Sequence, residues 1–302
     1  MNQLADFSIK PFVIHTDDVA WEQVGDGLRI KRLLCEENTG KIQYYFGVAE
    51  LAPGKDIPLQ KANLACCTHL LQGEVWSRVG RQRIQMEKEG SNYFPIGVPH
   101  AYEASGKYGV RFLFCYATDN AIGQSGLKFE PVSEEEARSQ YYPNCPSNLM
   151  SASAENTSFR WACAGDGAAW IPVEAGQGSR TLIFQDHFDD MTGSKEFWWG
   201  RCHVRPNCRY TPHYHLQSEI FYFLEGKGTM FAGDKTYKVT PGSLVYVPSN
   251  CVHGMVNDGA ETLVSLYTCN IENTGIAYER YEICDVPLIP PADRDDWMFS
   301  QI

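Results

Sequence analysis

The sequence has no excess of basic residues, and this excludes two classes of partner. It carries 26 Lys and Arg against 37 Asp and Glu, which gives a formal net charge of −11. Nucleic acids and anionic membranes are bound through basic patches. We therefore expect neither a nucleic acid nor a membrane as a partner of this chain.

Long hydrophobic runs are also missing. No apolar run approaches the roughly 20 residues that a membrane-spanning helix needs. The first residues, from Met1 to Asp6, have neither the basic start nor the apolar core of an export signal. We therefore predict a cytoplasmic location.

The cysteines form no Cys-x-x-Cys pair. There are 11 of them, an odd number, and most lie inside apolar runs. This favours buried free thiols in a reducing compartment. A redox role for the adjacent Cys66 and Cys67, or for Cys202 and Cys208, is the less favoured alternative.

The chain is long enough for two domains, and it repeats itself. Its 302 residues are 43% hydrophobic and 13% aromatic, as in a globular protein. The segment Trp21–Gly27 resembles residues 161–167, which lie 140 positions later. Four further residues return 153 positions later: Pro53 as Pro206, Gly73 as Gly226, Pro95 as Pro248 and His100 as His253. Similarity at so long a period indicates a duplicated unit.

Each half contains short apolar runs separated by Gly and Pro, which predicts β-strands. The predicted strands are 28–34, 42–51, 64–71, 83–86 and 110–116 in the first half, and 180–185, 196–204, 219–224, 244–247 and 263–269 in the second. Ser133–Tyr141 has a cap residue and an acidic first turn, so it predicts a short helix. A polar linker follows, and we predict two domains, 1–150 and 151–302.

Residues that bind first-row transition metals gather in the second half. His213 and His215 are two positions apart, so that a strand presents them on one face, and Glu219 follows. Glu219 opens an apolar run that ends at Gly226, and this run is predicted as the next strand of a hairpin. His253 returns from a later strand, five residues after Pro248.

These patterns, His-x-His-x3-Glu-x6-Gly and Gly-x5-Pro-x4-His-x3-Asn, resemble the two motifs of the cupin superfamily of jelly-roll barrels. The resemblance implies that His213, His215, Glu219 and His253 are metal ligands. Asn250 stands where the family usually has Gly, and Asn tolerates the left-handed conformation that the turn needs. With the repeat, this predicts an all-β fold of two tandem cupin barrels, a bicupin, with a short connecting helix.

The repeat predicts that only the second barrel binds metal. The positions that correspond to the first three ligands hold Gln60, Ala62 and Cys66, and only His100 is kept. The first barrel is then structural, packing against the active barrel or forming a homodimer. A different site made of Cys66, His69 and His100 is an open alternative.

Three His and one Glu leave about two positions open on an octahedral ion. We expect one divalent transition metal, with iron, manganese or nickel favoured and zinc or copper as alternatives. If Glu219 points into the barrel, so do Phe221 and Phe223. Val245 and Val247 on a facing strand complete an apolar wall that suits a small organic substrate.

The predicted function is a mononuclear metal-dependent enzyme that oxidises a small organic acid or enol with dioxygen. Glu219 is expected to act as ligand and proton acceptor, while Tyr210 or Arg201 orients the substrate. Arg201 and Arg205 on the preceding strand either hold a substrate carboxylate together or are solvated edge charges, and His203 is more often a surface or edge histidine than a base.

Two other functions stay open. The first is a redox-neutral lyase or isomerase, including a dimethylsulfoniopropionate-lyase-like enzyme, although that group usually has Tyr where this chain has Phe221. The second is a non-catalytic, metal-dependent binding protein. The segment 168–205 contains thirteen extra residues relative to the first half, and its polar stretch 185–195 predicts a loop, either solvated or closing over the site.

Overall fold

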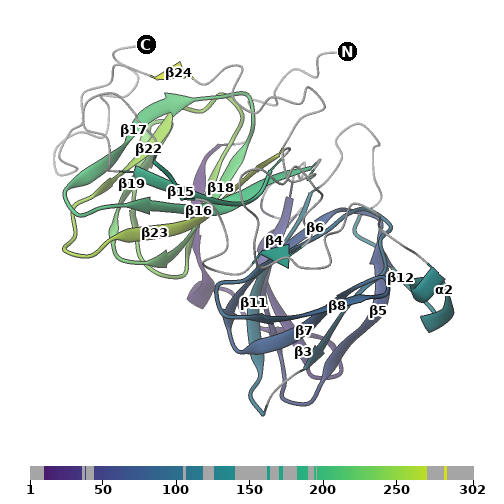
Figure 1. Cartoon of the computed structure of the whole chain (residues 1–302). Helices are drawn as coiled ribbons and strands as arrows, with labels where there is room; N and C mark the ends of the chain where they lie inside the picture. Colours follow the sequence, from purple (N-terminus) through teal and green to yellow (C-terminus); the bar gives the residue numbers. More distant parts are fainter. Residues whose placement is uncertain are drawn as a thin grey trace. The chain divides into compact units, whose positions relative to one another are not determined.

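The computed structural model describes residues 10–35, 38, 44–104, 107–117, 126–139, 162–163, 170–172, 182–189, 194, 196–270 and 282–283. In these ranges the chain is almost entirely β-strand, and the α-helix is short (Figure 1). The strands form two seven-stranded and two five-stranded sheets. They belong to two compact units, the first made of 18–169 with 187–197 and the second of 1–17, 170–186 and 198–302. We call them the first and the second barrel.

The first barrel is a two-sheet jelly roll. Its sheets have the orders β13-β9-β6-β11-β4-β3-β2 and β12-β5-β10-β7-β8, with antiparallel neighbours. Both sheets contribute to one core, in which Leu70, Val75, Met86 and Phe112 are buried. The strands are β2 Glu22–Gly25, β3 Leu28–Leu34, β4 Tyr44–Leu51, β5 Asp56–Ala62, β6 Cys66–Gln72, β7 Glu74–Val79, β8 Gln82–Glu87, β9 Ser91–Phe94, β10 His100–Ala104, β11 Val110–Ala117, β12 Phe129–Pro131 and β13 Ala162–Cys163.

The second barrel repeats this design. Its sheets have the orders β1-β21-β18-β23-β16-β15-β14 and β20-β19-β22-β17-β24. Phe221, Phe223, Val245 and Val247 all lie in its core, as the alternation along their strands predicts. The strands are β1 Phe12–His15, β14 Trp170–Pro172, β15 Leu182–Phe188, β16 Phe197–Val204, β17 Cys208–Tyr214, β18 Glu219–Glu225, β19 Gly228–Ala232, β20 Lys235–Val239, β21 Ser243–Val247, β22 His253–Asn257, β23 Leu263–Asn270 and β24 Glu282–Ile283.

Each barrel includes a strand from a distant part of the chain. Near the N-terminus, β1 pairs with β21 of the second barrel, and β13 pairs with β9 of the first. The addition of β1 is reinforced by side chains, because Thr16 bonds the hydroxyl of Tyr222 at 3.0 Å and Tyr237 donates to the carbonyl of Pro11 at 2.9 Å. The predicted domain boundary near residue 150 lies outside the described residues, and so does the second copy of the Trp-to-Gly repeat except for residues 162–163.

Most predicted elements are present. All ten predicted strands are found with shifts of a few residues at their ends, and the predicted helix is α2, Glu134–Ser139. Ser133 caps it, since its hydroxyl accepts from the backbone N–H of Glu136 at 3.1 Å.

Two local predictions were wrong. The first four residues of the polar stretch, Gln185 to Phe188, are not a loop but the end of strand β15, and all four are buried. Residues 190–193 and 195 of this stretch lie outside the described residues. The run that begins at Glu219 is not the hairpin partner of the His-x-His strand. β17 pairs with β22 and β24, whereas β18 pairs with β21 and β23 in the other sheet.

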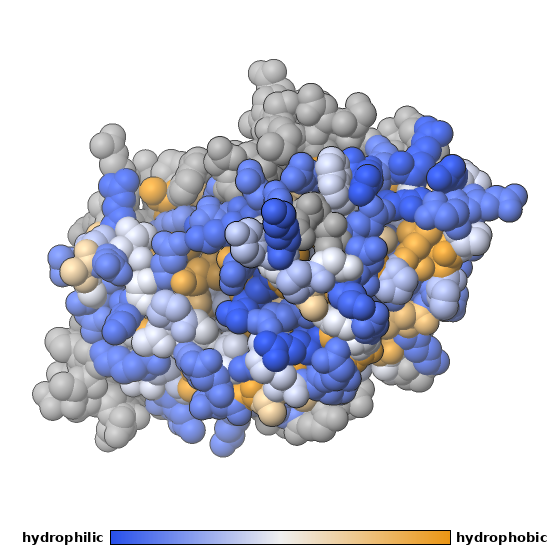
Figure 2. Space-filling model, turned by 90° about the horizontal axis from the view of Figure 1, so that it is seen from below, coloured by the Kyte–Doolittle hydropathy of each residue, from blue (hydrophilic) through white to orange (hydrophobic). Residues whose placement is uncertain are grey.

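The surface and the thiols agree with a globular chain. Hydrophilic residues cover most of the described surface on the face drawn in Figure 2, and hydrophobic ones appear as separate patches. Within the described residues, the cysteines are free thiols and no helix is long and apolar enough to cross a membrane.

Candidate metal centre

The proposed ligands come from both sheets of the second barrel. His213 on β17 lies directly opposite His253 on β22, in a register that shifts between Tyr210 and His213. His215 follows the end of β17, and Glu219 begins β18 in the other sheet. The short crossing between β17 and β18 therefore brings the carboxylate to the imidazoles.

The four side chains form a tight and buried group. One ligand atom from each of His213, His215, Glu219 and His253 lies within 4.8 Å of the others, and all four residues are buried. The Nε2 atoms of His215 and His253 lie 3.1 and 3.0 Å from the same carboxylate oxygen of Glu219. Three imidazoles thus surround one carboxylate inside the barrel.

The hydrogen bonds of two rings show which nitrogen is available. Nδ1 of His215 and Nδ1 of His253 each lie 2.9 Å from a backbone carbonyl, that of Gln217 and that of Cys251. A carbonyl only accepts, so each Nδ1 carries a proton and each neutral ring presents a lone pair at Nε2. Lone pairs that converge on the oxygen of Glu219 repel unless a cation or extra protons separate them. This donor set therefore fits a divalent transition metal ion.

The carboxylate is ionised at neutral pH. Burial raises the pKa of Glu219, but hydrogen bonds from His215 and His253, when their Nε2 atoms are protonated, outweigh it and lower that pKa to about 2. A buried anion among nitrogen donors is what a divalent cation neutralises best.

A turn with an unusual backbone places one ligand. Asn250 has φ of 58°, so it takes the left-handed conformation predicted for it. Its N–H donates to the carbonyl of His215 at 2.8 Å, and the turn leads directly into His253. The turn therefore fixes two ligands at once.

The other predicted site residues divide into two groups. Tyr210 is buried and its ring stacks on that of His213 at 4.4 Å, so it contacts the ligand set. Arg201 and His203 alternate along β16 with Cys202 and Val204, which lie in the barrel core. Their side chains leave the opposite face of the strand, and the structure does not bring Arg201 to the ligands.

A second polar pair in the same barrel was not predicted. The hydroxyl of Tyr267 on β23 donates a short hydrogen bond to Asp186 on β15, and both residues are buried. Tyr267 lies opposite Phe221, next to the pair formed by Glu219 and Cys269. Sequence reasoning missed Asp186 because its stretch was interpreted as a loop, and the fold alone brings it to Tyr267.

Gly200 makes room for this pair. It lies on β16, between the strands that carry the two residues. A Cβ at Gly200 would lie 2.6 Å from the carbonyl of Gln185 and 3.0 Å from the ring of Tyr267. The missing side chain therefore lets the tyrosine ring pass over β16 towards Asp186.

The first barrel keeps the geometry of the site without its ligands. His100 lies opposite Gln60, as His253 lies opposite His213, and its Nδ1 is 2.9 Å from the carbonyl of Val98. Burial lowers the pKa of His100 to about 4 and raises that of the Cys66 thiol to about 12. Within the described residues, the group in the second barrel is the one that suits a metal ion.

The alternative site of Cys66, His69 and His100 does not form. Cys66 lies in the core of the first barrel, whereas His69 is three positions along β6 and leaves the other face of the sheet. There its Nδ1 lies 2.9 Å from the hydroxyl of Ser91. Among the described residues, His69 therefore takes part in a separate buried hydrogen bond.

Two jelly rolls in one chain, with a buried three-histidine and one-glutamate group in the second, define a class of two-barrel metal-binding proteins. Residues 200–269 match the family model described as "Cupin domain". The second barrel therefore contains a cupin domain, and the two jelly rolls together give the chain the fold of a bicupin.

One curated relative and several solved structures are similar to the chain. Quercetin 2,3-dioxygenase of Bacillus subtilis (strain 168) is 32% identical over 94 residues, which span 29% of this chain and 28% of that protein. The chain thus matches less than a third of this relative's length.

The solved structures are similar over most of the chain. Oxalate decarboxylase of Bacillus subtilis, solved as a mutant, has a TM-score of 0.63 at 17% identity and covers 94% of this chain and 80% of its own. The formate complex of the Lactobacillus farciminis oxalate decarboxylase has a TM-score of 0.63 at 14% identity, and the match covers 93% of this chain and 90% of that chain. AerE from Microcystis aeruginosa has a TM-score of 0.59 at 12% identity, and the match covers 84% of this chain and 97% of that chain. At such identities the likeness shows the fold alone.

Proposed function

We propose that the second barrel is the active site of a metal-dependent enzyme that oxidises a small organic acid or enol with dioxygen. The observation that carries the proposal is the convergence of His213, His215, Glu219 and His253 in a buried group. Four protein donors leave positions for a substrate on a six-coordinate ion. The sequence match to a quercetin 2,3-dioxygenase adds support.

The four ligands would hold one divalent ion, with iron, manganese or nickel favoured and zinc or copper as alternatives. When bound, such an ion supplies Lewis-acid polarisation of a substrate oxygen and, for a redox-active metal, electron transfer with dioxygen. The remaining chemistry belongs to the barrel itself.

The walls of the barrel exclude water and orient the substrate. Phe221, Phe223, Val245 and Val247 are fully buried in the core of this barrel, so a bound organic molecule meets apolar surface. Tyr210 stacks on His213 and holds that ring in place. We expect specificity for a compact substrate with one oxygen-bearing end.

The hydrogen-bonded pair of Asp186 and Tyr267 contains a candidate proton acceptor. An enol or hydroxy acid must lose its hydroxyl proton before it can be oxidised at that oxygen. We propose that this proton passes to the carboxylate of Asp186, directly or through the hydroxyl of Tyr267. Asp186 and Tyr267 are not among the four proposed ligands, so this pair can move a proton while Glu219 stays ionised.

A redox-neutral lyase or isomerase is the second candidate. It is favoured by the same Asp186–Tyr267 pair, because proton abstraction next to a carbonyl needs a base but no oxidant. A non-catalytic small-molecule binder is the third, and it would need no proton acceptor at all. The predicted homodimer remains a prediction, which light scattering of the purified protein would test.

Metal content per chain tests the site. We expect about one ion in the wild-type protein, none in His215→Ala and one in His100→Ala, because within the described residues the donor group lies in the second barrel. His100→Ala is the matched control, since it removes the corresponding histidine of the degenerate barrel. Full metal in His215→Ala would refute the ligand assignment.

Oxygen consumption then separates the candidate reactions. Stoichiometric uptake of dioxygen with a small keto or hydroxy acid supports the oxidase proposal. Product formation without uptake supports the lyase or isomerase. A fully loaded protein that binds such acids without converting them would contradict both and leave the binder.

A further inference from the structure

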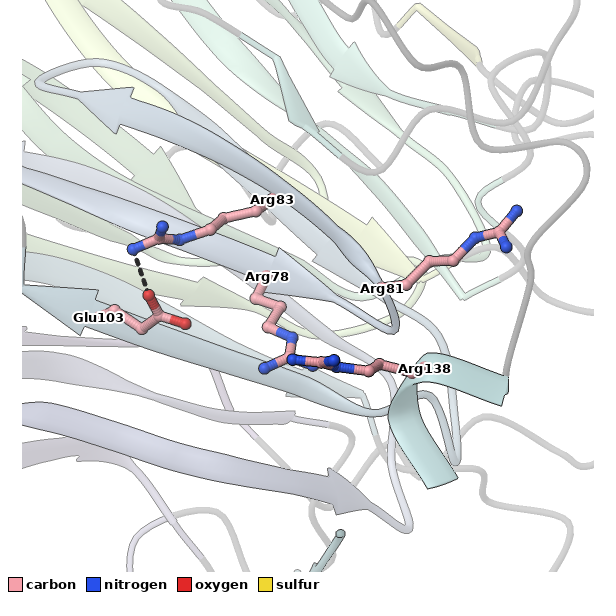
Figure 3. A pocket seen from close by; sticks show the side chains of 5 residues that line it. All are labelled: Arg78, Arg81, Arg83, Glu103 and Arg138. Carbon is pink, nitrogen blue, oxygen red and sulfur yellow. Dashed lines mark ion pairs between the residues drawn. The ribbon is translucent and has the colours of Figure 1, made fainter. Parts of the chain in front are cut away.

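A cleft on the first barrel is lined by arginines. It has a volume of about 530 Å³, and its lining consists of Arg78, Arg81, Arg83, Glu103 and Arg138. Figure 3 shows Arg78 and Arg138 reaching towards one another from β7 and α2, Arg83 turned towards Glu103, and Arg81 pointing outwards at the rim. Nothing in the proposed metal chemistry uses this cleft.

Two of the arginines occupy an arrangement that is unfavourable by itself. Arg78 on β7 and Arg83 on β8 are directly opposed across the strand pair. Like charges at directly opposed positions destabilise a sheet. Arg138 on α2 adds a third cation, and Arg81, in the turn between β7 and β8, adds a fourth. In a chain with a net charge of −11, such a concentration of cations stands out.

Two carboxylates compensate part of this charge. Arg78 makes a paired contact with Glu134, with N–O distances of 2.6 and 2.8 Å, and Arg138 lies 3.4 Å from the same carboxylate. Arg83 pairs with Glu103. Among the residues named here, four guanidinium groups and the two carboxylates of Glu103 and Glu134 lie in or beside the cleft.

We infer that this arginine cleft binds a small oxyanion with two or more negative charges, such as a phosphate or a polycarboxylate. Guanidinium groups match the planar pairs of oxygens in both. The volume is large enough for an anion of several heavy atoms but small for a macromolecule. This inference does not depend on the proposed metal chemistry.

Parts of the site are held in place before a ligand arrives. Arg78 is only 13% exposed in its side chain, and its Nε donates to the carbonyl of Gly80 at 2.9 Å. The guanidinium of Arg83 lies 4.5 Å from the ring centre of Trp76. Arg138 is 75% exposed, so it is available to close on an anion.

Calorimetric titration at low salt tests the inference, with inorganic phosphate and tricarballylate as probes and acetate as a monovalent comparison. The His215→Ala protein is titrated in parallel, so that any binding at the metal centre is separated. We expect saturable binding of one divalent or trivalent probe in both proteins. Removal of Arg81 or Arg138 by Arg→Ala substitution should weaken it roughly tenfold each.

Arg32→Ala is the matched control, because Arg32 is an exposed, ion-paired arginine of the same barrel outside the cleft. It should change the affinity less than about twofold. Binding of phosphate alone or tricarballylate alone identifies the kind of oxyanion. The inference is overturned if neither probe binds, if acetate binds equally well, or if the Arg81→Ala, Arg138→Ala double variant binds like the wild type.

Discussion

Asp186 and Tyr267 form a buried hydrogen bond in the second barrel, and neither residue belongs to the sequence motif of the proposed ligands. Asp186 lies on β15 and Tyr267 on β23, 81 residues away in sequence. The hydroxyl has a fixed acceptor and the carboxylate a fixed donor, so both are oriented before a substrate enters. A pair of this kind is suited to proton transfer rather than to metal binding.

Replacement of Asp186 by Asn should lower turnover by roughly a hundredfold or more, because the amide cannot accept the proton. Tyr267→Phe should have a similar or smaller effect, and both proteins should keep one ion per chain. The matched control is Asp258→Asn, which changes a surface carboxylate of the same barrel. Steady-state kinetics with metal analysis measures this, and unchanged turnover in Asp186→Asn would exclude the proton-acceptor role.

His100 occupies, in the first barrel, the position that corresponds to His253. It keeps its bond to the carbonyl of Val98, and it stacks on Phe94 with ring centres 4.5 Å apart. Burial lowers its pKa from 6.5 to about 4. The histidine is therefore neutral in the folded barrel at pH values where the unfolded chain protonates it.

This difference makes the stability of the first barrel depend on pH. The folded-state pKa of His100 is below the unfolded value. Above about pH 7 the histidine is neutral in both states and does not change the free energy of unfolding. As the pH falls from 6.5 towards 4, the unfolded chain takes up the proton first and stability is lost. The full loss is about 3 kcal/mol. Hydrogen exchange of β10 between pH 7 and 4 should show it, and His100→Gln should flatten the profile. An equal slope in His100→Gln would show that other groups cause it.

At the scale of the element, the turn before the last ligand is the clearest case of sequence determining local structure. Asn250 and Gly97 correspond in the repeat, and both have positive φ, 58° and 71°. The turn shape was thus kept in both barrels, although only one keeps the ligands. This explains why a Pro-x-Gly or Pro-x-Asn turn was a reliable prediction from sequence.

Alanine at the two corresponding turn positions separates shape from metal binding. Gly97→Ala should cost about 1–2 kcal/mol of stability, because the added Cβ disfavours the left-handed conformation. Asn250→Ala should cost less, because asparagine already has a Cβ and only its better tolerance of this conformation is lost. Nothing lies within 4 Å of a Cβ at Gly97, so strain alone acts there. Only Asn250→Ala should also weaken metal binding, since its N–H holds His215. Chemical unfolding and metal titration measure both, and equal metal affinity in the two variants would contradict this view of the turn.

At the scale of the whole molecule, each barrel takes a strand from a distant part of the chain. β1 closes the edge of β21 with four consecutive residue pairs. An uncovered strand edge exposes unpaired N–H and carbonyl groups. The metal-binding barrel therefore depends on residues near the N-terminus.

Deletion of residues 1–17 should destabilise the second barrel by several kcal/mol, at about 1 kcal/mol for each lost hydrogen bond. Hydrogen exchange should then be faster at Ser243–Val247 and unchanged at Gln82–Glu87. Val13→Thr is the control, because this side chain is exposed and threonine keeps the strand. Equal protection of both strands after the deletion would refute the role of β1.

The repeat, the turn residues and the ligand types were sufficient to predict two β-barrels and the His213, His215, Glu219 and His253 group. These features are local or periodic, so a single sequence displays them. The pairing of β17 and β18 with different sheets, the strand formed by Gln185–Phe188 and the addition of β1 to the second barrel were not predictable. Strand partners are chosen by burial over long sequence distances, which local patterns do not encode.

The difference between local patterns and long-range packing also explains which candidate site residues could be predicted and which could not. The motif spacing was sufficient to predict which four side chains converge, because neighbours in a strand and a turn place them. Only the tertiary structure turned Arg201 to the outer face of β16 and brought Asp186 to Tyr267. It also gathered the arginines of β7, β8 and α2 around one cleft. Side chains from separate strands meet only after the sheets have packed, and that packing is a property of the whole chain.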